Sequence, residues 1–397
     1  MRFSSFPFFA ALVAVASVLP AAESEVFFLE AAQLAKARSG GELAAVAWIR
    51  TEAGKLLDVP PPTVLDKTTV PASGDKHDYF SMGPYWWPDP AKPDGLPYVR
   101  RDGEVNPAAR AQSDAPAFAR TCRAIELLGT AYFVTGEERY AEKAAEFART
   151  WFLDPATRMN PNFQHAQAIP GVTTGRGIGI IEGQNLMWAN EGLALLADSP
   201  AWTAADRAAM RAWNEAFYLW LTTSRNGLDE KAWHNNHGTW YDAQVAHLAL
   251  VLGRRDEARR ILTEGLEVRL SKHIEPDGRQ PHELERTRSL GYSIYNLEAL
   301  FLCARLAERV DVDWWSFATA DGRSLGAALR FLAPYVDPAK PWIKQDLGET
   351  NRVRLVPLLR QYLLRRADAE LQAALEAATS GGTPDQPWRA LVDESRG

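Results

Sequence analysis

Cysteine is scarce in this chain of 397 residues, which contains Cys122 and Cys303 and no other. Two cysteines cannot build a disulfide scaffold or a zinc site of four thiolates. Because both lie in apolar helical patterns, we expect two separate buried thiols rather than a bridge. An excess of positive charge is also missing, since 44 Lys and Arg stand against 50 Asp and Glu, a net charge of −6. This balance gives no electrostatic support to nucleic-acid binding.

Long apolar runs are confined to the N-terminus, where residues 6–19 follow Arg2 and lead into Pro20-Ala21-Ala22. The run is shorter than the ~20 residues that span a bilayer, and small residues follow it. We therefore predict a secretory signal peptide over residues 1–22 and an exported mature protein, periplasmic or secreted, without a membrane segment. No stretch rich in Gly or Ser divides the rest. Residues 23–397 are predicted to form one domain, with a mobile tail after about residue 379.

Motifs for nucleotides and metals are missing as well. There is no Walker loop, dinucleotide fingerprint, nucleophile elbow or EF-hand loop. His234 and His237 could share a metal on one helical turn, but no HExxH pattern surrounds them and no third ligand lies nearby in sequence. We expect neither a metal nor a cofactor.

Aromatic residues are abundant, with 14 Trp, 16 Phe and 11 Tyr. Such a supply suits a large helical core, and it also suits a carbohydrate cleft in which flat sugar faces stack on rings. Apolar residues recur at helical spacing through most of the chain, and short turns join the segments. Successive antiparallel hairpins form either an open solenoid or a closed α/α barrel, and the lack of a strict repeat disfavours the solenoid. The sequence thus predicts an all-α protein, with helices over residues 28–57, 108–134, 137–153, 177–197, 203–223, 238–252, 256–270, 289–307, 324–335 and 353–377.

Residues 58–107 are the exception, because they are rich in proline and show little periodicity. A loop of this length inside a compact domain is usually functional or disordered, and its aromatic residues argue against disorder. We interpret it as an ordered lid or wall over a cleft. The alternative is a structural arm that packs the first helix against the next.

Three segments concentrate aromatic and polar residues: Tyr85–Pro90 with Arg101–Pro107, Trp233–Tyr241, and Asp277–Tyr292. Each has a structural explanation when taken alone. An Asn before an apolar helix is a good N-cap, and a helix start with Arg and Tyr can be a solvated face beside a core tyrosine. Capping, however, needs one Asn, not two and a histidine between tryptophans.

Together the three segments resemble the alginate-lyase superfamily, over roughly residues 63–335. The resemblance implies an α/α toroid, an incomplete barrel of antiparallel helical hairpins with one long ordered loop. It also implies β-elimination on an anionic polysaccharide, a uronate polymer such as alginate, polymannuronate or glucuronan. The interval from Arg286 to Tyr292 is one residue shorter than in the best-known alginate lyases. In this it is more similar to glucuronan and polymannuronate lyases, which leaves the polymer open.

The chemistry of that reaction explains the residue types. The proton on carbon 5 of a uronate becomes removable when the neighbouring carboxylate is neutralised by preorganised donors. The resemblance assigns neutralisation to Asn236 and His237, with help from Arg286, and the acid and base roles to Tyr292. Cationic neighbours are expected to lower the pKa of Tyr292. His237 is the alternative base where the proton lies on the opposite face of the sugar.

Spacing leaves the identity of the arginine open. Six helical residues rotate the chain by about 600°, so Arg286 would not share a face with Tyr292, whereas Arg288 would. Either Arg286 lies in a loop ahead of the helix, or Arg288 is the working residue.

Further substrate contacts are expected from residues that flank these motifs. Tyr85, Trp86 and Trp87 could stack on sugars or pin the long loop to the barrel, and Arg101 would attract the polyanion. A Gly-rich helix start that follows Gly175-Arg176-Gly177 presents Gln184 and Asn185, for which helix capping is the alternative. The remaining candidates that line the cleft are Trp240, Tyr241, His282 and Arg288.

Two rival functions fit parts of the sequence. A glycoside hydrolase on an α/α barrel would need a pair of carboxyl groups, and Glu182, Asp229 and Glu283 are available but not paired by any motif. A non-catalytic sugar-binding protein would use the tryptophans without needing the Asn, His, Arg and Tyr set.

Overall fold

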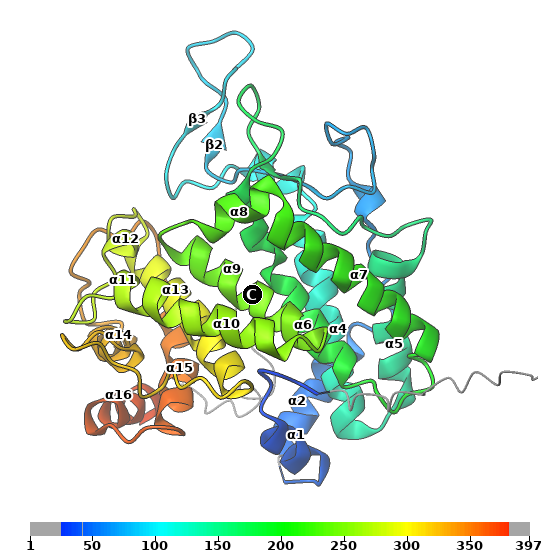
Figure 1. Ribbon diagram of the computed structural model, residues 1–397. Coiled ribbons are helices and arrows are strands. Elements are labelled where there is room, and N and C mark those ends of the chain that lie inside the picture. The colour runs from blue at the N-terminus through cyan, green and yellow to red at the C-terminus, as the bar shows by residue number, and fades with distance from the viewer. Residues whose placement is uncertain (1–24, 42, 381–397) are drawn as a thin grey trace, which may run out of the picture.

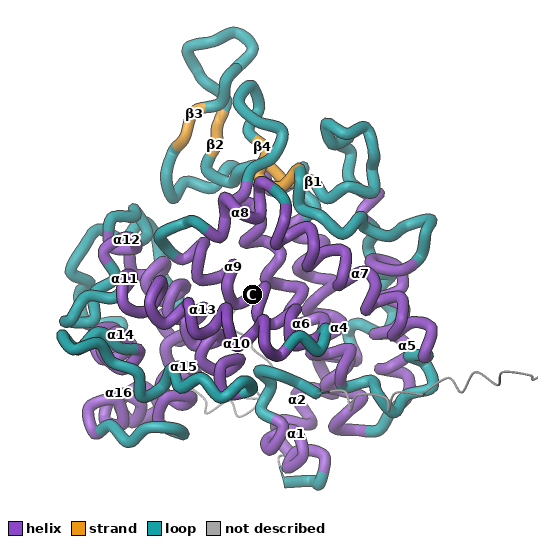
Figure 2. The backbone as a smooth tube through the Cα atoms, in the orientation of Figure 1, coloured by secondary structure: helices purple, strands orange, loops and turns teal. Residues whose placement is uncertain are grey.

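The computed structural model describes residues 25–41 and 43–380. The predicted signal peptide and the tail from residue 381 therefore lie outside the described residues. Helices carry the fold throughout this part of the chain (Figures 1 and 2). Within it, no helix combines the length and the apolar character that crossing a membrane would require.

The helices occur in hairpins, as the short turns predict. In chain order they are α1 (Ala31–Arg38), α2 (Leu43–Gly54), α3 (Pro107–Ala111), α4 (Ala115–Thr135), α5 (Glu138–Ala148), α6 (Asn185–Ala194), α7 (Ala204–Thr223), α8 (Arg225–Lys231), α9 (Asn236–Val251), α10 (Arg255–Gly265), α11 (Ser271–His273), α12 (Pro281–Leu284), α13 (Ser289–Glu308), α14 (Leu325–Leu332), α15 (Leu355–Leu363) and α16 (Ala369–Ser380). Short 3₁₀ helices are η1 (Val64–Asp66), η3 (Gly177–Gln184), η5 (Ala333–Val336) and η6 (Arg352–Arg354), and π turns are η2 (Arg149–Leu153) and η4 (Leu266–Leu270).

Helix pairs follow one another around the molecule from α4 and α5 on one side to α14, α15 and α16 on the other (Figure 1). Helix α4 packs against α2, α5 and α6, and α9 packs against α10 and α13. Helices α9 and α13 are buried along most of their length, which makes them the inner layer of an α/α toroid. The prediction of an all-α toroid of helical hairpins is confirmed.

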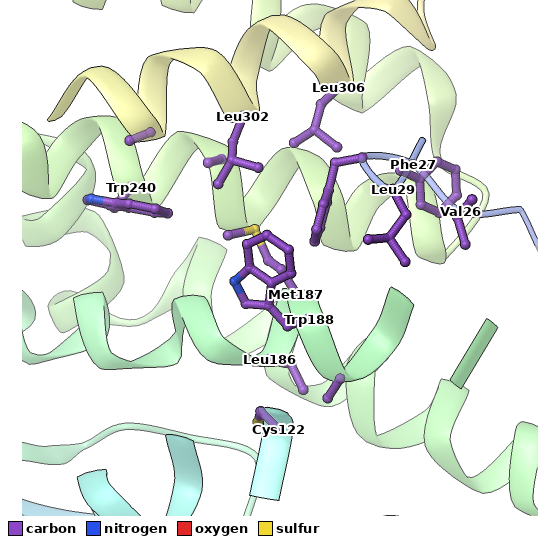
Figure 3. Packing of buried hydrophobic residues seen from close by; sticks show 14 of the residues in the cluster. Val26, Phe27, Leu29, Cys122, Leu186, Met187, Trp188, Trp240, Leu302 and Leu306 are labelled. Carbon is purple, nitrogen blue, oxygen red and sulfur yellow. The ribbon is translucent and has the colours of Figure 1, made fainter. Parts of the chain in front are cut away.

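The core lies between the inner helices. Figure 3 shows Met187 and Trp188 of α6 facing Leu302 of α13, with Trp240 of α9 beside them. Cys122 on α4 and Cys303 on α13 are both buried and free, so the expectation of two separate thiols is confirmed.

The long loop is ordered and contains strands that periodicity does not reveal. Strand β1 (Phe80–Met82) pairs in parallel with β4 (His165–Ala168), and β2 (Trp86–Trp87) pairs antiparallel with β3 (Val99–Arg100). The segment between β2 and β3 projects from one end of the toroid (Figure 1). Residues after β3 then return to the mouth of the toroid beside α12 and α13.

Candidate active site

Tyr292 and Arg286 are brought together by the start of helix α13. The helix begins at Ser289, so Tyr292 lies in its first turn and Arg286 lies in the turn that precedes it. From there Arg286 folds back: its Nη2 donates to the Tyr292 hydroxyl at 3.0 Å, and its Cζ lies 4.0 Å from the centre of the Tyr292 ring. Arg288 instead donates its Nε to the Gly103 carbonyl at 2.9 Å. The first of the two alternatives for the arginine therefore holds, and Arg288 anchors the long loop.

Arg286 is held in place by Asp102 of that loop. The two side chains form an ion pair at 2.9 Å, and Asp102 also accepts a hydrogen bond from the Thr287 hydroxyl at 3.0 Å. Burial opposes ionisation, but the hydrogen bonds and charge of Arg286 outweigh it and lower the pKa of Asp102 to about 2. The turn at Gly103 has a φ of +78°, and a side chain there would collide with Thr287. Asp102 was not among the predicted site residues, although it lies inside the Arg-Asp-Gly-Glu run.

The long loop reaches the site a second time through Tyr85. Its hydroxyl lies 2.7 Å from the hydroxyl of Tyr292, so Tyr292 has a hydrogen-bond partner on each side. Burial raises the pKa of Tyr292, and Tyr85 adds to the rise more than Arg286 offsets it. The expectation of a lowered pKa is therefore wrong for this state of the protein. The phenol is protonated at neutral pH, which suits a proton donor.

Asn236 is placed by the N-terminus of helix α9. Asn235 is the N-cap and accepts the His237 backbone N–H at 3.2 Å, so capping uses the first Asn and not the second. The Asn236 backbone N–H and side-chain Nδ2 each donate to the Glu283 carboxyl at 2.7 Å. Both residues are buried, and burial raises the pKa of Glu283.

Glu283 connects this pair to the arginine. It belongs to α12, and its backbone carbonyl accepts the Arg286 backbone N–H at 3.1 Å. The charges of Arg286 and His237 both act on its carboxyl group. One buried acid therefore joins the Asn236 side of the site to the Tyr292 side.

His237 is oriented by a second buried acid. Its Nδ1 lies 2.9 Å from Oε1 of Glu230, whose side chain is wholly buried, while 15% of the His237 side chain remains exposed. A proton on Nδ1, shared with this carboxyl, leaves Nε2 as an acceptor toward solvent. The arrangement suits either a carboxylate-facing donor, when the ring is protonated, or a base. Neither Glu230 nor Glu283 was predicted as a hydrogen-bond partner of His237 or Asn236.

Of the remaining predicted contact residues, some are half-buried and others lie behind them. Trp86 and Trp87 form β2 and are half-buried, with the Arg176 and Arg101 guanidinium groups 5.8 Å and 5.0 Å from their rings. His282 is half-buried, with its ring 4.6 Å from that of His234. Behind them, Gln184 donates to the Tyr295 hydroxyl and Asn185 donates to the Glu182 carbonyl.

Trp240 and Tyr241 do not fit the predicted role. Trp240 is wholly buried and its ring lies 5.0 Å from that of Tyr295, while the buried Tyr241 donates its hydroxyl to the Leu221 carbonyl at 3.0 Å. Helix α9 is enclosed by its neighbours on nearly every side, so the residues that follow the motif point into the core. Both are core residues here, and we correct the prediction accordingly.

Two of the three carboxyl groups that were considered for a hydrolase have internal hydrogen-bond partners, whereas Asp229 is exposed. Glu182 accepts hydrogen bonds from Tyr79 at 2.7 Å and Ser81 at 2.6 Å, and Glu283 is engaged by Asn236. Across residues 25–41 and 43–380, no group of three or more His, Cys, Asp and Glu side chains is arranged to hold a metal ion.

Comparisons with known proteins agree with this fold. The family model described as alginate lyase matches residues 63–342. The crystal structure of an alginate lyase from Bacteroides ovatus is 37% identical, covers 92% of this chain and 98% of its own, and superposes with a TM-score of 0.86. Alginate lyase A1-III from Sphingomonas species A1 is 21% identical, covers 82% of this chain and 88% of its own, and has a TM-score of 0.50. A variant of the A1-III enzyme complexed with a tetrasaccharide has a TM-score of 0.52 at 21% identity, with the same coverage. A search of curated protein sequences finds no match. Since the family model spans well over half of the chain, the protein belongs to the alginate lyase family and is a polysaccharide lyase.

Proposed function

We propose that the protein cleaves alginate, or a closely related uronate polymer, by β-elimination at the site formed by Asn236, His237, Arg286 and Tyr292. The observation that carries the proposal is the hydrogen bond from Arg286 to a protonated Tyr292 hydroxyl. Alginate is the first choice because the relative at 37% identity is named an alginate lyase. Polymannuronate and glucuronan are the alternatives that the short interval from Arg286 to Tyr292 suggests.

The proposed reaction divides the work between two sides of the site. The uronate carboxylate would lie against Asn236, His237 and Arg286, whose donors stabilise the charge that develops when the proton on carbon 5 leaves. As the C5–H bond breaks, a double bond forms between carbons 4 and 5, and the bond from carbon 4 to the bridging oxygen breaks. Tyr292 gives its proton to that oxygen.

The base depends on the face of the sugar that carries the proton. When the proton and the leaving oxygen share a face, Tyr292 must lose its own proton before it can act as the base, a step that its raised pKa opposes and that the charge of Arg286 favours. It then takes the proton from carbon 5 and passes that proton to the leaving oxygen. His237, with Nε2 free, serves when the proton lies on the opposite face. Both follow from the same set of contacts, and the stereochemistry of the polymer selects between them.

The predicted signal peptide is consistent with a polymeric substrate. We propose that residues 1–22 are removed as a signal peptide and that the mature protein acts in the periplasm or outside the cell. A polysaccharide is met there, and the reaction needs no cofactor supplied by the cytoplasm.

The deciding experiment compares Tyr292→Phe with Tyr295→Phe. Lysis produces an unsaturated uronide that absorbs ultraviolet light, so both variants and the wild type are assayed on alginate, polymannuronate, polyguluronate and glucuronan. Tyr295 lies one helical turn on in α13 and is also hydrogen-bonded through its hydroxyl, to Gln184, which makes it a matched control.

We expect the activity of Tyr292→Phe to fall by at least the ~100-fold typical of general acid–base catalysis, and the activity of Tyr295→Phe to fall far less. Equal activity in the two variants would contradict the mechanism. New reducing ends without ultraviolet absorption would indicate a hydrolase instead.

A further inference from the structure

The Arg176 side chain is a half-buried cation whose hydrogen bonds go to a neutral residue. Its Nε donates to the Gln167 backbone carbonyl at 3.1 Å, and its Nη2 donates to the Gln167 side-chain oxygen at 2.9 Å. Among residues 25–41 and 43–380, no carboxylate forms a direct ion pair with it; the charge of Arg100 acts against its ionisation, and the charges of Glu182 and the buried Glu230 favour it from farther away. Burial outweighs these two carboxyl groups and lowers the pKa of Arg176 to about 10. A guanidinium that is partly removed from water without a direct ion-pair partner is costly, so an anionic ligand is the expected compensation.

The fold holds this cation in a strained and closely packed frame. Gln167 is buried and adopts a left-handed φ of +48°, a conformation that non-glycine residues rarely take. Its backbone N–H donates to Ser81, whose hydroxyl in turn donates to Glu182. Beside Arg176, a side chain at Gly175 would collide with the Gln164 carbonyl. Strain of this kind persists where the surrounding contacts enforce it, and it gathers at functional sites.

Arg176 lines a cavity of about 400 Å³ together with Ile178, Asp229, Trp233 and His234. The Trp233 ring is 37% exposed and lies 6.1 Å from the ring of His237, and the His234 ring lies 4.6 Å from that of His282. The cavity is therefore a neighbour of the candidate active site, on the His237 side. Its volume falls within the range of small-ligand sites.

We propose that this cavity is a subsite for a second uronate unit, next to the unit that is cleaved, with Arg176 as the group that binds its carboxylate. An arginine can engage a carboxylate through two parallel N–H groups, and an exposed tryptophan offers a face on which a sugar ring stacks. Asp229 is exposed and can accept hydrogen bonds from sugar hydroxyl groups. The subsite rests on the proposed uronate lyase function and extends it by a specific contact. With this contact the enzyme would favour substrates that carry a carboxylate on the unit next to the one that is cleaved.

The test uses Arg176→Gln, Arg176→Lys and the control Arg260→Gln. Arg260 lies on α10, outside the lining of this cavity, and its exposed side chain pairs with Glu264 on the same helix. Alginate oligosaccharides of two to six units serve as probes, with kinetics on the active enzyme and calorimetric binding on the Tyr292→Phe variant. We expect Arg176→Gln to raise KM and Kd by about tenfold for oligosaccharides long enough to reach the cavity, the value of a lost charge-assisted hydrogen bond of ~1.5 kcal/mol. The shortest oligosaccharides and kcat should be unaffected, Arg176→Lys should fall between, and Arg260→Gln should match the wild type.

The outcomes separate the subsite from the lyase function. If the wild type cleaves alginate and Arg176→Gln binds every length as well as the wild type does, the subsite is wrong and the lyase function stands. If the wild type cleaves no uronate polymer, the lyase function is wrong, and the loss of oligosaccharide binding in Arg176→Gln would still support the subsite.

Because Arg176 also holds Gln167, Trp233→Ala is the second variant. Its side chain is exposed, so the fold should survive, and the same dependence on length is expected. A uniform loss across all lengths would overturn the proposal.

Discussion

The hydroxyl oxygens of Tyr85 and Tyr292 lie 2.7 Å apart, although 207 positions separate the two residues in the chain. They form one end of a hydrogen-bonded series that runs from Asp102 through Arg286 to Tyr292 and Tyr85. The long loop supplies both ends of this series, and the turn before α13 and its first residues supply the middle. The loop therefore contributes side chains to the candidate active site.

Replacing Tyr85 with Phe should slow the reaction without unfolding the loop. The change removes one of the two hydrogen bonds on the Tyr292 hydroxyl and leaves the ring. A hydrogen bond of about 1 kcal/mol corresponds to roughly a fivefold to tenfold change, and we expect kcat to fall by about that factor. Steady-state kinetics measure it, with Tyr98→Phe in the same loop as control. A KM effect with an unchanged kcat would mean that Tyr85 acts on the substrate alone.

Replacing Asp102 with Asn should impair catalysis through Arg286. The amide keeps the shape of the side chain but loses the charge that fixes the guanidinium, so Arg286 would spend less time against Tyr292. We expect kcat to fall by roughly tenfold to 100-fold, while the melting temperature changes little for a half-buried pair. The control is Asp94→Asn, an exposed residue of the same loop that accepts the Leu96 N–H at 3.0 Å. An Asp102→Asn variant as active as the control would remove Asp102 from the site.

The sequence points to the candidate catalytic side chains but not to their hydrogen-bond partners. Asn236, His237 and Tyr292 lie within short motifs, and local spacing places them at helix starts. Their acidic partners are contacts of the folded chain: Asp102 is 184 residues from Arg286, and Glu283 is 47 residues from Asn236. No local pattern reveals such pairings. Glu283 was noticed only as a candidate for a hydrolase.

Spacing alone also does not determine which residues lie at the candidate site. The choice between Arg286 and Arg288 depends on where α13 begins, and helix starts are the least certain feature of a periodic pattern. Trp240 and Tyr241 follow the motif directly, but α9 is an inner helix whose faces are nearly all covered, so adjacency in sequence did not mean adjacency to the substrate. A segment predicted as one helix over residues 177–197 is in fact η3 followed by α6, which sets Arg176 at the edge of a cavity.

Replacing Glu283 with Gln should lower both stability and activity. Asn236 directs two donors at this carboxyl group, and the amide would present its own N–H₂ to one of them. Leaving one buried donor unsatisfied costs about 1–3 kcal/mol, which should appear as a lower melting temperature. Because Asn236 would lose its fixed position, kcat should fall as well. The matched control is Glu285→Gln, an exposed position two residues away. A loss of stability with a normal kcat would confine Glu283 to a structural role.

Acid should weaken the fold through His273. This side chain is 4% exposed and its ring lies 6.2 Å from that of His282; burial, together with the charge of Arg269, lowers the pKa of His273 to about 3. In the unfolded chain a histidine titrates near its usual pKa of about 6.5. Between about pH 6.5 and pH 3 the unfolded state therefore binds more protons than the folded state. The stabilising contribution is complete above pH 6.5 and is lost as the pH falls toward 3.

The change that isolates this effect is His273→Gln, which removes the titrating group from a site that also contacts Thr239. The variant should be less stable than the wild type at about pH 7, but its urea midpoint should fall less steeply between about pH 7 and about pH 4, because the proton uptake that drives the loss is gone. Only the difference in slope is compared, so the cost of the substitution itself cancels. His77→Gln, a change in the long loop that does not involve His273 or His282, serves as the control and should keep the wild-type slope. Parallel midpoint curves for the wild type and His273→Gln would show that this buried histidine is not the source of the acid sensitivity.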